Sequence, residues 1–283
     1  MTDVSVPKRL PAPAASALPA PRPMAFTPTD WGLDPQKMGK MPTRPRRGFG
    51  AAAIIGDEDR MQIGVTDADP WRLICSLVYH RNGVARSAGT GTLIGPRLVL
   101  TAGHCLDDDP DEIEVIPGLG PGGTRPFGSV RVAPDAFRLH PAWTANRRAE
   151  RDAGALVLDA PIAGVDTWFG VTNRDSDDLV GWFVSIAGYP EIRPALDPHA
   201  PRYAEGDEMW FHSNAITEAR DRELHYGVDT TAGQSGSSVW LYEDGQPTVV
   251  GIHAYGSRRK NFATRIDDDL LGQIGSWSPE GGG

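Results

Sequence analysis

Two short stretches of the sequence decide the fold class: Leu-Thr-Ala-Gly-His-Cys at residues 100–105 and Gly-Gln-Ser-Gly-Ser at residues 233–237. The first places His104 directly after an apolar, strand-like run, and the second places Ser235 in a glycine-flanked turn. A serine hydroxyl is a poor nucleophile at neutral pH, and a neighbouring imidazole that accepts its proton activates it. The two stretches therefore predict the two chemical halves of a serine hydrolase.

A candidate for the third member of such a site is Asp152, which precedes an apolar run at residues 153–158. Its carboxylate would fix the tautomer and the orientation of the imidazole. An aspartate before a strand is often only a turn residue, and this alternative stays open. The order His104, Asp152, Ser235 is the order of chymotrypsin-type proteases, whereas subtilisins run Asp, His, Ser and α/β-hydrolases run Ser, Asp, His.

The turn that carries Ser235 also predicts an oxyanion hole. The backbone N–H groups of Gly233 and Ser235 are expected to point at one position, with Gly233 required for its backbone conformation. No metal or organic cofactor is needed for this chemistry. Among other candidates, Asp107-Asp108-Asp109 fits a calcium site or, more simply, a solvated acidic loop. His80, His140, His199, His212 and His225 lack the spacing of metal ligands.

Composition supports a turn-rich, mostly β protein. The 283 residues include 33 Gly and 25 Pro, with 40% hydrophobic residues, and short apolar runs recur without alternating helices. The net charge of −9 argues against nucleic acid as a partner. No apolar stretch reaches the roughly 18–20 residues of a membrane span. We expect a monomer that acts on protein or peptide substrates.

The chain divides near residue 52. Residues 1–52 are rich in Pro, Ala and basic residues and predict a disordered extension, read either as a pro-segment or as a tail without a role. They show no signal peptide. From residue 53 onward strand-like segments follow one another, with Asn82-Gly83 as a strong hairpin turn. The expected strands are residues 73–79, 90–94, 98–102, 155–158, 183–187, 208–212, 226–228, 239–242 and 248–254, and residues 268–277 are the expected terminal helix.

Several ordered motifs resemble the bacterial glutamyl endopeptidases, a group of chymotrypsin-like serine proteases. The matching segments are residues 89–96, 99–105, 152–155, 186–190, 228–237, 251–253 and 264–266. The resemblance implies an all-β fold of two six-stranded antiparallel barrels, about residues 53–165 and 166–283. It also implies an active site between the barrels, with His104 and Asp152 from the first and Ser235 from the second.

The resemblance also implies a specificity pocket. A histidine at the position of His253 and a hydroxyl at the position of Thr230 bind a substrate glutamate carboxylate, and Gly256 follows on the same strand. Asp229 is a competing signal, because an aspartate six residues before the serine selects Arg or Lys in trypsin-type enzymes. The combination with His253 favours Glu or Asp at P1, and a core role for His253 stays open. It also stays open whether Arg258, Arg259 and Lys260 add positive charge to this pocket.

Two further expectations concern processing and the cysteines. Ile54-Ile55-Gly56 resembles the mature N-terminus of these enzymes, so an activating protease is expected to cut close to Ala53. Cys75 and Cys105 are either two buried thiols or one disulfide. Related enzymes place the partner of the second cysteine near residue 89, which is glycine here, and the bridge is expected to have moved to Cys75. A disulfide and the family both indicate a secreted or extracytoplasmic protein.

A second class of function is also open on sequence grounds. A protease-like scaffold can serve as a non-catalytic binding module. An intact triad and oxyanion turn argue against this reading, because a scaffold without catalysis has no physical need for all three side chains.

Overall fold

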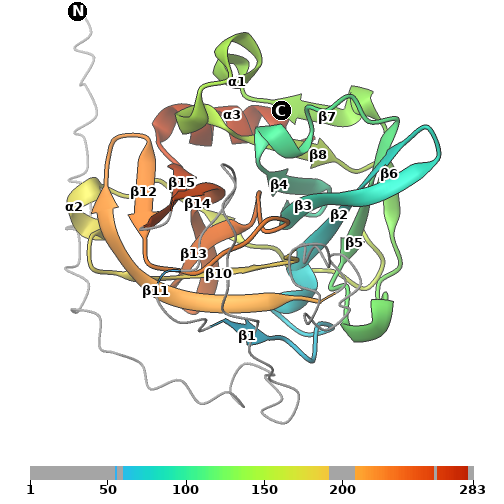
Figure 1. Cartoon of the computed structure of the whole chain (residues 1–283), viewed down its shortest axis with the longest axis horizontal. Helices are drawn as coiled ribbons and strands as arrows, with labels where there is room; N and C mark the ends of the chain where they lie inside the picture. Colours follow the sequence, from blue (N-terminus) through green and yellow to red (C-terminus); the bar gives the residue numbers. More distant parts are fainter. Residues whose placement is uncertain (1–54, 56–59, 191–207, 258–259, 280–283) are drawn as a thin grey trace, which may run out of the picture.

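Strand pairing divides the chain into two β-units, shown in Figure 1. The structure is a computed structural model that describes residue 55 and residues 60–190, 208–257 and 260–279. The Pro-rich extension, the expected cleavage region before residue 55, His199, Arg258 and Arg259 lie outside the described residues. In the described part, no helix is long and apolar enough to cross a membrane.

The first sheet has seven antiparallel strands in the order β6-β5-β2-β3-β4-β8-β7. Their bounds are β2 (Ile74–Arg81), β3 (Val84–Gly95), β4 (Leu98–Thr101), β5 (Glu112–Pro117), β6 (Val130–Val132), β7 (Phe137–Leu139) and β8 (Gly154–Val157). The β2–β3 hairpin turns at Asn82 and Gly83, whose φ angles of 51° and 76° are those of a type I′ turn. The turn predicted from the sequence is therefore confirmed.

The second sheet has eight strands and closes on itself. Its order is β1-β11-β10-β13-β14-β15-β12, a further β11–β12 pairing closes a six-stranded barrel, and β9 pairs parallel with β14. The bounds are β1 (Met61–Gln62), β9 (Gly170–Val171), β10 (Phe183–Gly188), β11 (Trp210–Ala219), β12 (Glu223–Tyr226), β13 (Ser238–Glu243), β14 (Gln246–Ser257) and β15 (Lys260–Arg265). The expected all-β fold is confirmed. The second unit is the closed six-stranded barrel that we expect from the sequence, whereas the first is a seven-stranded half-barrel rather than a second closed barrel.

Helices are few and short: α1 (Pro141–Asn146), α2 (Ser176–Leu179) and α3 (Asp268–Trp277). Helix α3 has the bounds predicted from the sequence. Its N-cap is Asp267, whose carboxylate accepts the N–H of Leu270. It buries Leu270, Ile274 and Trp277, and Figure 1 shows it beside β8 of the first sheet although the chain enters it from the second.

One hydrophobic core runs across both sheets. It joins first-sheet residues such as Leu77 and Val99 to second-sheet residues such as Phe211 and Trp240. A smaller core fills the closed barrel and includes Tyr226. Because the main core is shared, the two sheets are fixed against each other, and loops from both meet at one junction.

Candidate active site

The first sheet brings His104 and Asp152 together. Strand β4 ends at Thr101, which pairs with Gly154 at the start of antiparallel β8. His104 follows β4 in a short 3₁₀ turn and Asp152 precedes β8, so both lie at the same edge of the sheet. Asp152 accepts two hydrogen bonds from His104, from the backbone N–H at Oδ1 (2.8 Å) and with Nδ1 at Oδ2 (2.6 Å).

The environment of His104 favours its protonated form. Its side chain is 31% exposed, whereas Asp152 is fully buried. Burial of the ring opposes a positive charge, but the neighbouring sulfur of Cys105 and the carboxylate of Asp152 outweigh it and hold the pKa of His104 well above its ordinary value. A ring that bonds to a buried carboxylate through Nδ1 presents Nε2 outward, which is the arrangement a general base needs.

Ser235 lies in a tight turn of the second sheet. The Gln234 N–H donates to the Thr231 carbonyl (3.1 Å), and Gly233 at the third position of the turn has φ +90°. A type II turn requires a positive φ at this position, which glycine adopts without strain. Among the described residues, the N–H groups of Gly233 and Ser235 have no acceptor. Two unused donors next to a serine hydroxyl are the chemical requirement for an oxyanion hole.

Thr90 of β3 joins this turn to the first sheet. Its N–H donates to the Ser235 carbonyl (2.8 Å), and its hydroxyl donates to the Gly233 carbonyl (3.0 Å). Cys105 adds a contact from its Sγ to the same Ser235 carbonyl (3.5 Å). The described residues include no hydrogen bond between His104 Nε2 and the Ser235 hydroxyl. Such bonds are often long or misaligned without substrate.

His253 is fixed next to the nucleophile turn through its backbone. Its carbonyl accepts the N–H of Gly236 (2.8 Å), and its N–H donates to the carbonyl of Ser237 (2.8 Å). The imidazole is fully buried, and its Nδ1 lies 2.7 Å from the Tyr226 hydroxyl. Burial, followed by the charge of His104, lowers the pKa of His253 to about 3, so the ring is neutral.

Several polar atoms around the nucleophile turn are buried without a partner among the described residues: Nε2 of His253, Nε2 of Gln234 and the hydroxyl oxygens of Thr230, Ser237 and Ser238. Of these residues, His253 and Thr230 are the two predicted for the specificity pocket, and both side chains are fully buried. Buried polar groups in native proteins are nearly always hydrogen-bonded, so the unpartnered His253 and Thr230 atoms at the predicted pocket call for an explanation. Gly256, the remaining predicted pocket residue, lies on β14 three positions after His253 and pairs with Asn261.

Asp229 is fully buried, and its carboxylate is already occupied. Oδ1 accepts the backbone N–H of Ile55 at 2.6 Å. The Asp229 N–H donates to Nδ1 of His212 (2.8 Å), and Oδ2 lies 3.8 Å from that nitrogen. Asp229 therefore binds the segment that leads into β1.

The expected disulfide is absent from the described residues, and this prediction is wrong. Cys75 and Cys105 are free, buried thiols. The register pairs Cys75 with Gly91, and its sulfur points back to the Leu73 carbonyl (3.9 Å). Cys105 instead lies over Gly89, where an added Cβ would be 2.7 Å from Sγ. Cys75 is thus displaced along the strand pair from the position that a bridge to Cys105 requires.

A model of the trypsin-like peptidase domain matches residues 89–252, well over half of the chain. The chain belongs to the trypsin-like peptidase family. The glutamyl endopeptidase of Bacillus licheniformis is 29% identical over 266 residues, which cover 89% of this chain and 78% of that protein. A Bacillus subtilis protein named extracellular metalloprotease is 28% identical over 233 residues, 80% and 70% of the two chains.

The solved structure of a Glu endopeptidase in complex with MPD supports the fold of this trypsin-like peptidase. It superposes with a TM-score of 0.66 at 22% identity and covers 79% of this chain and 98% of that one. The trypsin-like peptidase is a serine protease of the chymotrypsin fold, similar in sequence to glutamyl endopeptidase. The predicted family, fold and enzyme class are confirmed.

Sequence reasoning missed several residues that surround the site of this trypsin-like peptidase. Arg60 is 2% exposed, and its Nη1 donates to Gln234 Oε1 (2.5 Å) and to Thr231 Oγ1 (2.8 Å). Tyr226 and His212 bind His253 and the Asp229 backbone, as described above. For Arg60 the sequence offers one signal, because it is a single arginine close to the predicted mature N-terminus. Nothing local in the sequence marks Tyr226 or His212 as site residues.

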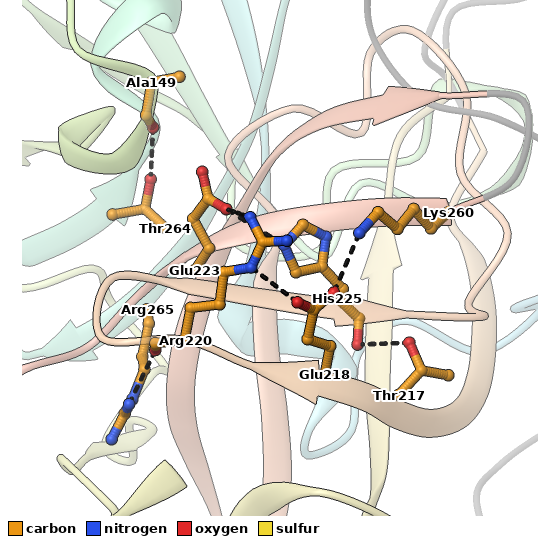
Figure 2. Close-up of polar contacts among 9 residues, drawn as sticks. All are labelled: Ala149, Thr217, Glu218, Arg220, Glu223, His225, Lys260, Thr264 and Arg265. Atoms are coloured by element: carbon orange, nitrogen blue, oxygen red, sulfur yellow. Dashed lines mark hydrogen bonds and ion pairs between the residues drawn. The ribbon is translucent and has the colours of Figure 1, made fainter.

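Another polar cluster of the trypsin-like peptidase lies on β11, β12 and β15. Figure 2 shows Glu218, Arg220, Glu223 and His225 linked on the outer side of β11 and β12, with Lys260 of β15 bound to Glu218. The same view shows the Thr264 hydroxyl donating to the Ala149 carbonyl (3.2 Å), and Thr264 also reaches the Asp152 carbonyl (3.3 Å). Strand β15 of the second sheet thereby supports the loop that carries Asp152.

The proposed calcium loop is also paired. Asp107 accepts the indole N–H of Trp143 (2.8 Å) and forms an ion pair with Arg147. Within the described ranges, no group of three or more His, Cys, Asp or Glu side chains could hold a metal ion.

Proposed function

We propose that the protein is a serine endopeptidase in which Ser235 is the nucleophile, His104 the general base and Asp152 the orienting carboxylate. The observation that carries this proposal is the pair of hydrogen bonds between His104 and buried Asp152, at the same junction as the Ser235 turn. Ser235 Oγ attacks the scissile carbonyl while His104 Nε2 takes its proton. The same proton then passes to the leaving amine, and water repeats the sequence on the acyl-enzyme.

The N–H groups of Gly233 and Ser235 complete the proposal. They have no acceptor among the described residues, and they would bind the oxyanion of the tetrahedral intermediate. A single donor of this kind is worth about 3–4 kcal/mol of transition-state stabilisation in measured cases. Thr90 supports this role because it fixes both flanking carbonyls of the turn.

We further propose a preference for Glu or Asp at P1. His253 Nε2 and the Thr230 hydroxyl are buried without partners, and a substrate carboxylate would supply the acceptors that both groups lack. The similarity to the Bacillus licheniformis glutamyl endopeptidase supports the same preference. A trypsin-like preference through Asp229 is less favoured, because that carboxylate already accepts the Ile55 N–H.

The same contact supports activation by trimming. Ile55 lies two residues after Ala53, so a cut beside Ala53 would release a chain end close to Asp229 and the nucleophile turn. We propose that residues 1–52 are a pro-segment of an exported protein, which agrees with the extracellular Bacillus subtilis relative. N-terminal sequencing of active material should begin near residue 53, and an active chain that begins at residue 1 would contradict this.

Cleavage of a mixed peptide library tests the proposed activity. The wild-type chain, the same chain starting at Ala53 and a Ser235→Ala variant are compared by mass spectrometry. Cuts after Glu and Asp that are missing in Ser235→Ala would support both the triad and the preference. Cuts after Arg or Lys would keep the triad and assign the pocket to Asp229. A folded protein that neither cleaves nor reacts with a fluorophosphonate probe would be a binding module.

A further inference from the structure

Tyr226 occupies a defined place behind His253. It ends β12, pairs with Asn261 of β15, and β15 in turn pairs with β14, which carries His253. Side chains alternate across a strand, and Figure 2 shows His225 in the outer charged cluster, bonded to Glu223. Tyr226 therefore points inward, and it is a fully buried member of the barrel core.

The hydroxyl of Tyr226 and Nδ1 of His253 form a 2.7 Å hydrogen bond, which can hold its proton in two ways. Either the phenol donates to Nδ1 and the ring carries its hydrogen on Nε2, or Nδ1–H donates to the phenol oxygen and Nε2 is bare. Burial raises the pKa of Tyr226 well above its ordinary value and lowers that of His253 to about 3, so both groups are neutral. The neutral pair therefore carries two polar hydrogens, one on the phenol and one on the imidazole, and each needs an acceptor.

Once an acidic P1 side chain is bound at Nε2, only the first arrangement gives both hydrogens an acceptor. In the second, the Tyr226 O–H would need another acceptor, and the described residues around it offer none, since its one hydrogen bond is to His253. A bare Nε2 lone pair would also face the position that we assign to a substrate carboxylate, and two acceptors repel each other. In the free protein the first arrangement leaves Nε2–H as a buried donor without an acceptor, and a substrate carboxylate would supply that acceptor.

We infer that Tyr226 is a specificity-determining positioning residue: its hydroxyl donates to Nδ1 of His253 and holds the Nε2–H tautomer that binds an acidic P1 side chain. This inference rests on the proposed preference for Glu and Asp at P1. It adds that Tyr226, through His253, determines the discrimination between Glu and Gln at that position. Tyr226 contacts neither the substrate nor the reacting atoms.

The test compares peptides that differ only in Glu or Gln at P1, cleaved by wild type, Tyr226→Phe and Tyr189→Phe. Tyr189 is the matched control, because its hydroxyl is equally buried but donates to the carbonyls of Ile74 (3.3 Å) and Leu119 (3.1 Å). Removal of the Tyr226 hydroxyl should lower the Glu/Gln ratio of kcat/KM by about tenfold or more, mainly through KM for Glu. Tyr189→Phe should leave the ratio unchanged.

Labelling of Ser235 by a fluorophosphonate, which carries no P1 carboxylate, reports on the triad separately and should proceed at the wild-type rate in Tyr226→Phe. A wild type that cleaves Glu and Gln peptides equally would refute the proposed preference. A wild type that prefers Glu while Tyr226→Phe keeps the full ratio would refute the role of Tyr226 alone.

If Tyr226→Phe does not fold, NMR on protein that keeps both Tyr226 and His253 tests the inference instead. The ¹⁵N shifts of His253 in Ser235→Ala protein, assigned by comparison with a further His253→Gln substitution, distinguish the two tautomers. A protonated Nε2 with an unprotonated Nδ1 is expected. The opposite tautomer, or a doubly protonated ring at pH 7, would overturn the inference.

Discussion

Nη1 of Arg60 lies 2.5 Å from Oε1 of Gln234, the residue directly before the candidate nucleophile Ser235. Gln234 Oε1 also accepts the N–H of Thr231 (3.0 Å), so both ends of the nucleophile turn are held at one oxygen. Arg60 directly precedes β1, which pairs with β11 of the barrel. The segment directly before β1 is therefore bonded to the turn that presents the proposed oxyanion donors.

Substitution of Arg60 by Gln should loosen this turn. The variant loses a buried, charge-assisted hydrogen bond to Gln234, worth about 1.5–3 kcal/mol of folding free energy. We expect a lower kcat with little change in KM, because the proposed oxyanion donors of Gly233 and Ser235 would act in the transition state. Steady-state kinetics and thermal unfolding measure both effects. Arg131→Gln is the control, since Arg131 is 58% exposed and pairs with Glu112. Equal kcat in wild type and Arg60→Gln would disprove the coupling.

Substitution of Asp152 by Asn should nearly abolish turnover while keeping the fold. An amide can still accept the His104 N–H, but its NH₂ group cannot accept Nδ1–H, so the imidazole would adopt the wrong tautomer. The loss in kcat for such a change is on the order of 10⁴-fold. Asp159→Asn, at an exposed position just after β8, serves as the control and should retain wild-type kcat. Retained activity in Asp152→Asn would remove Asp152 from the proposed triad.

The pH profile should report the raised pKa of His104. Burial of the ring works against protonation, but Cys105 and Asp152 outweigh it, so the imidazole should become protonated above the ordinary value near 6.5. Because a protonated imidazole cannot act as a base, kcat/KM should fall below that raised pKa as pH decreases. The effect on folding stability runs in the opposite direction to the effect on kcat/KM. The contribution of protonated His104 to the free energy of unfolding is complete below pH 6.5 and is lost as pH rises through the raised pKa. NMR titration of His104 in Ser235→Ala protein measures the pKa of this imidazole, and a midpoint at or below 6.5 contradicts the prediction.

Substitution of Gly89 by Ala should damage the site although Gly89 is outside the proposed triad. An added Cβ would lie 2.7 Å from both Cys105 Sγ and the Ser235 carbonyl oxygen, and φ at this position is +143°. Gly83→Ala is the matched control, because its φ is also positive (+76°) while its Cβ would meet nothing within 4 Å. Both variants lose stability through strain, but only Gly89→Ala should lose most of its kcat. A similar kcat in the two variants would show that the contacts near residue 89 are not needed.

The elements that the sequence predicts correctly are those whose signal lies within a few neighbouring residues. The Asn82-Gly83 turn and helix α3 were predicted correctly because turn chemistry and helix periodicity lie within a few residues. Strand β5 was missed although residues 112–115 alternate charged and apolar side chains, which is a local strand signal. Strand β15 was missed because residues 260–265 show no such alternation and form a strand through pairing with β12 and β14. Arg60 and Tyr226 were missed for the same reason: their partners are 174 and 27 positions away. The disulfide error has a related cause, because the strand register could not be obtained to within two residues.

Arg151 and Asp267 carry the last prediction, since they join the loop before Asp152 to the cap of helix α3. Arg151 is 2% exposed and donates to both carboxylate oxygens of Asp267, at 2.9 and 2.8 Å. Arg151→Met would leave the half-buried Asp267 carboxylate with the Leu270 N–H as its remaining donor, and the loss of the charge-assisted bonds from Arg151 should cost about 1.5–3 kcal/mol in folding free energy. Asp267→Asn should cost less, because the amide can still cap Leu270 and Arg151 keeps a second carboxylate, Asp269, at 3.0 Å.

The pH dependence of unfolding distinguishes this ion pair from simple packing. Burial alone would raise the pKa of Asp267, but the hydrogen bonds from Arg151 and the Leu270 N–H outweigh it and lower that pKa. The stabilisation is therefore present above the ordinary aspartate pKa of about 3.9 and is lost as pH falls through the lowered value. Urea unfolding between pH 3 and 7 should show a smaller acid loss in Asp267→Asn than in wild type. Parallel curves would mean that the ion pair between Arg151 and Asp267 adds no charge-dependent stability.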